Sequence, residues 1–220
     1  MVFRISVTLK EIVQAETLQD ALDKVLNRFP YYRVRLRAGF FWYYLERNEA
    51  RSFVQAESET PCHGLPDAGS AGHLFRVQAY KRRISVEFFH ALTDGTGGLN
   101  FLKTLTAAYL ERKGSHITDW GELLNPEDCP NPEEFEDAYH RYNSHSAPKP
   151  PRLRPAFRLS YPLRSDFRYS YITGECSATR LHSCAKNLDA SVTEYIAGVY
   201  LFVLQQIYRD LPPHEKRRHN

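Results

Sequence analysis

The residues that could do chemistry are concentrated in one stretch, Phe88-Phe89-His90-Ala91-Leu92-Thr93-Asp94-Gly95-Thr96-Gly97-Gly98. This stretch follows a run with strand alternation and precedes an apolar run with helical periodicity. His90 is therefore predicted at a strand end, and Asp94 lies four residues later, where glycines permit a sharp turn. Because an imidazole titrates near neutral pH, His90 is the candidate acid-base group.

A structural role for the same histidine is the alternative. Side chains on a strand alternate with period two, so His90 shares a face with Ile84, Val86 and Phe88. An imidazole on an apolar face needs a hydrogen-bond partner, because an unsatisfied buried polar group destabilises the fold. A buried histidine that donates to a backbone carbonyl would satisfy this requirement. The residues alone leave both roles open.

The spacing His-x-x-x-Asp-Gly at a strand-to-loop junction resembles the motif of the CoA-dependent acyltransferase superfamily. That superfamily includes chloramphenicol acetyltransferase, the condensation domains of peptide synthetases, and alcohol acetyltransferases. Its motif usually carries two consecutive histidines, of which the second is the catalytic base. Here Phe89 takes the first position and His90 the second, so the base is retained. The resemblance covers most of the chain, since matching elements precede and follow the motif.

The resemblance implies direct acyl transfer from a thioester to an alcohol or amine acceptor. The donor would be acyl-CoA or an acyl carrier protein acting as co-substrate, and no tightly bound cofactor or metal is expected. His90 Nε2 would take the proton of the attacking acceptor, and no acyl-enzyme would form. Asp94 would have a structural role, in which it pairs with an arginine and holds the loop, and Gly95 would permit the turn. The candidate partners of Asp94 are Arg158, Arg164 and Arg168.

The elements around the motif predict an α+β fold. The resemblance makes this a two-layer α/β sandwich like that of chloramphenicol acetyltransferase, with a mixed sheet flanked by helices. Strand alternation starts at Phe3, and helical spacing then runs from Leu18 to Phe29, where Pro30 stops it. Thr17 and Asp20 are interpreted as a capping box for this helix. An arginine-flanked strand over 33–37 and a further strand over 40–45 come next.

The elements next to the motif are two strands and a helix. The strands, over 74–80 and 84–90, are joined by the tight basic turn Lys81-Arg82-Arg83. The helix is predicted over 99–112, and Gly97 and Gly98 are interpreted as backbone freedom for the turn that leads into it. The glycine pair lacks the P-loop and Rossmann fingerprints, so it does not indicate a phosphate site.

Composition divides the chain into three predicted segments. By the resemblance, residues 1–147 would form an N-terminal acyltransferase-like lobe that carries the motif, and the Pro- and Arg-rich residues 148–166 are expected to form an extended linker. Residues 167–220 form the beginning of a truncated C-terminal lobe, with a strand from Phe167 and helices capped at Ser177 and Ser191. The two-lobed members are longer and carry an Asp-Phe-Gly-Trp-Gly-like motif that this sequence lacks. The second lobe is therefore expected to be incomplete.

Other patterns favour structural interpretations. Cys62-His63-Gly64 offers one cysteine and one histidine, which do not make a metal site. The acidic residues between 119 and 137 predict a solvated connector and not a paired-carboxylate site. The arginines of strand 33–37 predict a solvated face and not an anion patch. The basic residues of 148–168 predict a surface linker, with a contact to the phosphates of coenzyme A as the alternative.

Composition narrows the functional classes. With 220 residues, 42% of them hydrophobic, the chain can bury a core, and its net charge of +3 gives little support for a nucleic-acid partner. No signal peptide or membrane span is visible, and four scattered cysteines indicate reduced thiols, so a cytoplasmic protein is expected. Two classes remain open. One is an acyltransferase that uses His90, and the other is an inactive half-lobe that binds a second copy or a complementing C-terminal lobe.

Overall fold

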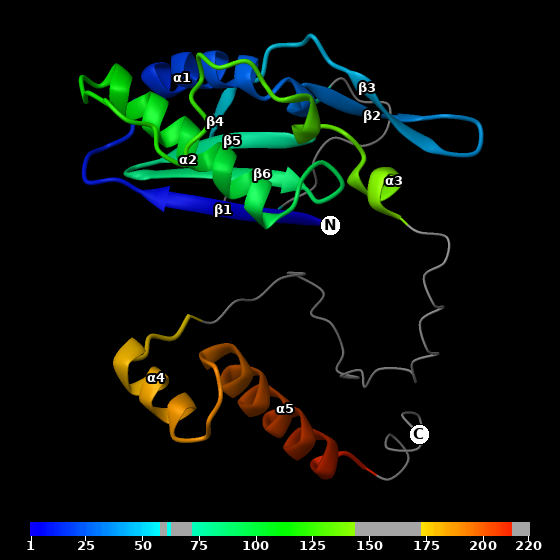
Figure 1. The fold of residues 1–220 in the computed structure, drawn as a ribbon, viewed down its shortest axis with the longest axis vertical. Coiled ribbons are helices and arrows are strands. Elements are labelled where there is room, and N and C mark those ends of the chain that lie inside the picture. Colours follow the sequence, from blue (N-terminus) through cyan, green and yellow to red (C-terminus); the bar gives the residue numbers. More distant parts are fainter. Residues whose placement is uncertain (58–60, 63–71, 144–172, 213–220) are drawn as a thin grey trace. The chain divides into compact units, whose positions relative to one another are not determined.

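A computed structural model describes residues 1–57, 61–62, 72–143 and 173–212 of the chain (Figure 1). The chain divides into two compact units, residues 1–143 and residues 144–220. The motif lies in the first unit. The predicted linker over 148–166, its boundary at residue 147, and the strand predicted from Phe167 lie outside the described residues.

A four-stranded sheet with strand order β1-β6-β5-β4 forms the base of the first unit. The strands β1 (Val2–Thr8), β6 (Arg83–Phe89) and β5 (Phe75–Tyr80) are antiparallel neighbours, whereas β4 (Val54–Ala56) pairs parallel with β5. The predicted basic turn joins β5 to β6, with Lys81 at a φ of 50°. The prediction of a mixed sheet is confirmed.

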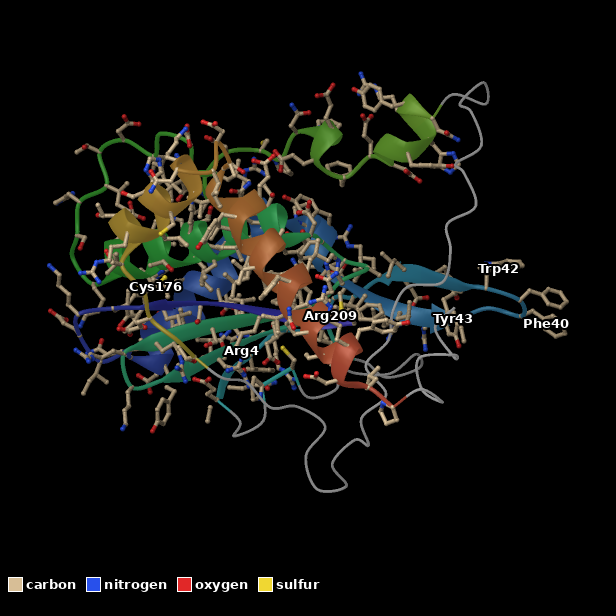
Figure 2. The ribbon with its side chains drawn as sticks, turned by 90° about the horizontal axis from the view of Figure 1, so that it is seen from below. Arg4, Phe40, Trp42, Tyr43, Cys176 and Arg209 are labelled. Atoms are coloured by element: carbon tan, nitrogen blue, oxygen red, sulfur yellow. The ribbon has the colours of Figure 1, made fainter. Side chains whose placement is uncertain are left out.

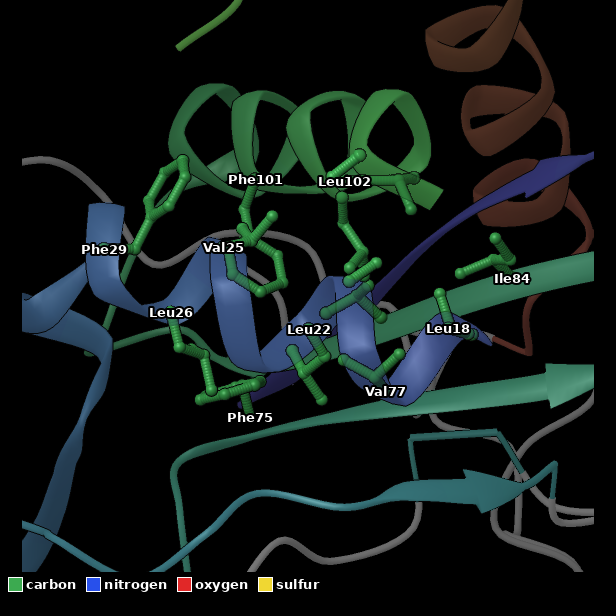
Figure 3. Packing of buried hydrophobic residues seen from close by; sticks show 14 of the residues in the cluster. Leu18, Leu22, Val25, Leu26, Phe29, Phe75, Val77, Ile84, Phe101 and Leu102 are labelled. Atoms are coloured by element: carbon green, nitrogen blue, oxygen red, sulfur yellow. The ribbon is translucent and has the colours of Figure 1, made fainter. Parts of the chain in front are cut away.

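Two helices, α1 (Ala15–Arg28) and α2 (Gly95–Arg112), pack together on one face of this sheet (Figure 3). The strand register aligns apolar side chains in rows on that face, because residues two apart point the same way. One row joins Phe3, Phe88 and Phe75, and the next joins Ile5, Val86 and Val77. The helices and the sheet enclose one core, so the predicted two-layer α/β sandwich is confirmed.

The opposite face of the same strands carries buried charge. Glu87 is 0% exposed and lies between Arg4 and Arg76 in the strand register. Its carboxylate accepts hydrogen bonds from Arg4 Nε at 2.7 Å, Arg76 Nε at 2.5 Å and the Cys62 N–H at 2.7 Å. Burial by itself raises the pKa of Glu87. The hydrogen bonds from the Cys62 N–H, Arg76 and Arg4 lower this pKa by more than burial raises it, so the net shift is downward.

A second sheet consists of the hairpin β2 (Val34–Ala38) and β3 (Tyr43–Arg47), which follows the helical turn η1 (Pro30–Tyr32). The strand predicted over 40–45 starts later, because residues 40–42 form the hairpin turn. The acidic residues after α2 are mostly exposed, as predicted, and include the helical turn η2 (Pro132–Glu134) and the short helix α3 (Ala138–Tyr142).

Both helices predicted in the second unit are present. Ser177 caps α4 (Ala178–Lys186), and Ser191 and Glu194 form the predicted capping box of α5 (Val192–Asp210). The nearly uniform apolarity of α5 predicts that protein encloses this helix. No residue of α5 is buried by the described residues of its own unit.

Two predicted helix starts are wrong. Helix α1 begins at Ala15, and Thr17 already lies inside it, donating its hydroxyl to Gln14 Oε1 at 3.2 Å, so Thr17 and Asp20 do not form a capping box. Helix α2 begins at Gly95, four residues before the predicted start, because Asp94 is its N-cap. Among the described helices, none combines the length and apolarity needed to cross a membrane.

Candidate functional site

His90 is the first residue after β6, and its side chain is exposed. Its backbone N–H donates to the Met1 carbonyl at 2.9 Å, which extends the β1–β6 pairing to the motif. The imidazole leans on the Phe3 ring, with 5.0 Å between ring centroids and 57° between the planes. Within the described part of the chain, the ring nitrogens have no hydrogen-bond partner. The imidazole is therefore oriented by packing on Phe3 and is exposed.

Asp94 holds the loop to the helix that follows. Its carboxylate accepts the Gly97 N–H at 2.8 Å, and its carbonyl accepts the Gly98 N–H at 3.0 Å. This is the geometry of an N-cap, which satisfies donors that a helix terminus leaves unpaired. Asp94 forms no ion pair with an arginine in residues 1–57, 72–143 or 173–212. The three arginines proposed as its partner lie outside the described residues.

The glycines of the motif differ in what they permit. A Cβ added at Gly95 would meet nothing within 4 Å, so the residue at this first helical position is not constrained by packing. A Cβ at Gly97 would lie 2.2 Å from Thr93 Oγ1, and one at Gly98 would lie 3.1–3.3 Å from Ile5, Phe88 and Phe3. Gly97 and Gly98 lie within α2, so the interpretation of both as turn residues is wrong. Gly98 allows α2 to approach the sheet closely, and Gly97 leaves room for the Thr93 side chain.

The loop between β6 and α2 is also hydrogen-bonded to Tyr32, at the end of η1. The Tyr32 hydroxyl donates to Thr93 Oγ1 at 3.0 Å. Burial, assisted by the charge of Asp94 and opposed by the Thr93 hydrogen bond, raises the pKa of Tyr32 to about 12. Tyr32 is therefore a neutral donor at physiological pH and holds Thr93 in place beside the cap.

A cleft of about 530 Å³ opens on the Asp94 side of the loop. Its lining includes Tyr31, Tyr32, Asp94 and Asn100, and His90 is not among the lining residues. Glu134 also lines the cleft and accepts from both terminal nitrogens of the Arg28 guanidinium, at 2.6 and 2.7 Å. The Arg28 hydrogen bonds lower the pKa of Glu134, which burial alone would raise. This lining carboxylate is thus neutralised by an arginine, and most of the remaining lining residues are uncharged.

The other positions singled out in the sequence, where the structure describes them, take part in interactions that stabilise the fold. Phe89 is partly buried, and its N–H donates to the Leu74 carbonyl at 2.8 Å. The N–H of Cys62 donates to buried Glu87, whereas His63 lies outside the described residues. Arg35 and Arg37 of β2, which were predicted to lie on a solvated face, are partly exposed and both bond the Glu46 carboxylate.

Sequence reasoning missed three residues of the site: Phe3, Tyr32 and Thr93. Alternation places Phe3 on the inward face of β1, but its contact with His90 depends on a pairing across most of the first unit. Tyr32 follows the Pro30 stop and has no local signal for its bond to Thr93. One available signal was missed as well. Asp is a preferred N-cap residue, so Asp94 could have predicted that α2 begins at Gly95 and that Thr93 directly precedes its cap.

No protein-family model matches the chain, and none of the curated proteins matches it. Solved structures do match. The protein SgcC5 from Streptomyces globisporus is 18% identical, with 56% of this chain and 32% of that chain covered and a TM-score of 0.41. The X-domain from teicoplanin biosynthesis is 17% identical, with coverages of 59% and 30% and a TM-score of 0.43.

A third match comes from a study of condensation domain-mediated chain release from the enacyloxin polyketide synthase. It is 18% identical, with 49% of this chain and 25% of that chain covered and a TM-score of 0.37. The chain spans between 25% and 32% of the length of these three structures. What the site does is therefore inferred from its own residues.

Proposed function

We propose that this chain supplies the base of a thioester-dependent acyl-transfer site, with His90 Nε2 taking the proton of an acceptor alcohol or amine. The observation that carries the proposal is the exposed imidazole, anchored through its backbone to Met1 and through its ring to Phe3. No described residue occupies its ring nitrogens. A general base requires a nitrogen that a substrate can reach within hydrogen-bond distance.

The proposed reaction balances without a covalent enzyme intermediate. The acceptor oxygen or nitrogen attacks the thioester carbonyl while His90 removes its proton. The new C–O or C–N bond forms as the C–S bond breaks. The thiolate leaves and takes the proton from the imidazolium. The donor is an acyl-CoA or an acyl carrier protein, and a complementing lobe would contribute the remainder of the site.

Mass spectrometry of acylated products tests this function. The chain is mixed with acetyl-CoA and a panel of alcohols and amines, and the product is quantified directly, because the four free cysteines would react with a thiol reagent. His90→Ala should lower the rate about 10²–10⁴-fold. The matched control is His116→Ala, since His116 is also exposed and lies outside the motif. Equal rates for wild type and His90→Ala would falsify the proposal.

Asp94 is proposed to act as a positioning residue. Asp94→Ala removes the cap of α2 and should lower the free energy of unfolding by about 1 kcal/mol. Asp94→Asn retains an acceptor for the Gly97 N–H and should keep that stability. Measured in the same acyl-transfer assay, Asp94→Asn should retain activity if capping is the whole role. A variant that is stable and inactive would instead indicate the arginine pair.

A second function is favoured by α5. Several of its large apolar side chains are exposed, which is typical of a surface that other protein covers. They are Ile196, Val199, Tyr200, Leu201, Phe202 and Val203. On this proposal the chain is an inactive half-lobe that requires a complementing lobe. Light scattering distinguishes the two functions, because a compact monomer that stays soluble at high concentration would count against the half-lobe.

A further inference from the structure

The β2–β3 hairpin ends in five consecutive aromatic residues, Phe40 to Tyr44, and the first three form its tip (Figure 2). Phe40 is 89% exposed, Phe41 84% and Trp42 64%. The turn is closed by a hydrogen bond from the Gly39 N–H to the Trp42 carbonyl at 2.7 Å. The Phe40 and Phe41 rings meet edge to face, 4.6 Å apart. The tip is thus a formed turn that presents apolar rings to solvent.

The side chains behind the tip change character with distance from it. Tyr43 and Tyr44 come first and are also exposed. Arg37 lies opposite Tyr44 in the hairpin register, and Arg35 lies opposite Glu46. Arg37 lies in β2, three residues before Phe40, and therefore stands behind the tip. Aromatic rings, tyrosine hydroxyls and guanidinium groups therefore follow one another along the ribbon.

The stem of the hairpin has more positive than negative charge. Arg35 and Arg37 share the single carboxylate of Glu46, with Nε–Oε2 distances of 2.7 and 3.0 Å. Arg33 and Arg47 likewise share Glu49. Each carboxylate balances one of its two arginines. The stem therefore retains net positive charge behind the apolar tip.

From this order of side chains we infer that the β2–β3 hairpin docks the chain on an anionic lipid surface, with Phe40, Phe41 and Trp42 inserted below the headgroups. Interfacial elements bury their apolar part about 5–10 Å into the boundary of headgroups and acyl chains. Tyrosine is enriched at headgroup depth, and basic residues gain from nearby anionic lipids. A lipid surface can deform around a narrow apolar tip while its headgroups contact the charges behind that tip. A protein partner would be expected to bind a broader and flatter patch.

Trp42 is the reporter for the test. The chain has two tryptophans, so Trp120→Phe leaves Trp42 as the only one. Phosphatidylcholine vesicles containing phosphatidylglycerol should shift its emission to shorter wavelength, and lipids brominated on the acyl chain should quench it. Phe40→Ser combined with Phe41→Ser should weaken cosedimentation with these vesicles at least about tenfold, because two apolar rings no longer leave water.

A matched variant controls for the loss of an exposed aromatic ring beside an arginine. Phe53 is 57% exposed and lies under the Arg51 guanidinium at 5.4 Å, and it is not part of β2, β3 or the turn between them. Phe53→Ser should bind vesicles as the parent chain does. Arg35→Gln and Arg37→Gln should each weaken binding about fivefold on anionic vesicles and much less on pure phosphatidylcholine. Circular dichroism of every variant verifies that the fold is retained.

Several outcomes would overturn the inference. One is the absence of an emission shift and of cosedimentation at low salt. Another is equal loss of binding in Phe53→Ser and in the tip variant. A third is an emission shift that follows protein concentration without vesicles, with a rising mass in light scattering, because a second copy would then cover the tip. His90→Ala should leave vesicle binding unchanged, so this test and the acyl-transfer test fail independently.

Discussion

At the scale of single residues, the site depends on a glycine in α2, Gly98, whose lack of a side chain leaves room for the aromatic rings of the sheet. Gly98 lets α2 lie against Phe3 and Phe88, and Phe3 is the ring on which His90 leans. A change in the packing at Gly98 is therefore transmitted to the imidazole through one aromatic ring. Gly95, three residues earlier, has no such neighbour.

Gly98→Ala is expected to lower the free energy of unfolding by about 1–3 kcal/mol, because the new methyl group overpacks the core next to the sheet. This loss outweighs the gain of roughly 1 kcal/mol that alanine has over glycine in a helix. Urea denaturation followed by circular dichroism gives the value.

Gly95→Ala is the matched control for that variant. Its Cβ enters open space, so stability should be unchanged or higher by less than about 1 kcal/mol. A result in which both variants lose the same stability would contradict the packing role assigned to Gly98.

At the scale of elements, β6 supplies side chains to the interactions on both faces of the sheet. Val86 and Phe88 point into the core, and Glu87 between them points to the ionic cluster with Arg4 and Arg76. The same strand then delivers His90. The strand is thus held on one face by apolar packing and on the other by charge, which leaves little freedom at its end.

Glu87→Gln is expected to lower the free energy of unfolding by about 3 kcal/mol at neutral pH, because it removes the charge of a buried carboxylate that accepts from Arg4, Arg76 and the Cys62 N–H. The pKa of Glu87 is lowered in the folded state from its ordinary value of 4.5. Its contribution is therefore fully present above that value and is lost as the pH falls through the lower, folded-state pKa.

Urea denaturation at neutral and at acidic pH measures this difference between wild type and Glu87→Gln, which should shrink below about pH 4.5. Glu127→Gln is the control, since Glu127 pairs with Lys24 at the surface with 72% of its side chain exposed. Its unfolding midpoint should remain close to that of the wild type. A difference for Glu87→Gln that does not vary with pH would rule out the charge as its cause.

At the scale of the whole molecule, the hydrophobic core belongs to the first unit. The buried cluster extends from Leu18 to Tyr109, and the described residues that pack against it lie before residue 125. The second unit contains α4 and α5, and Ala185 is the only buried residue of these two helices. The unit that carries the motif therefore contains the interactions that stabilise its own fold.

A fragment of residues 1–143 should accordingly unfold in one cooperative transition, with a melting temperature within a few degrees of the first transition of the full chain. Thermal denaturation followed by near-ultraviolet circular dichroism tests this, because that signal requires fixed aromatic packing. A fragment without that signal, or one that melts without cooperativity, would mean that the second unit is needed for the core.

Local sequence patterns were sufficient for much of the fold. Alternation identified β1, β5 and β6, helical spacing identified α1 and α5, and Pro30 marked the end of α1. These signals are reliable because they depend on neighbours a few residues away. The start of α2 was missed because three glycines in its first turn conceal a helix that Asp94 caps.

The sequence by itself determined which residues could do the chemistry: His90 at a strand end and Asp94 at the entrance to a helix. Only the tertiary structure decided that Phe3 orients the imidazole, that Gly98 is small so that helix and sheet can touch, and that Arg4 balances Glu87. The physical reason is separation along the chain. Periodicity and caps act between near neighbours, whereas each of these contacts joins β1 to residues more than eighty positions away.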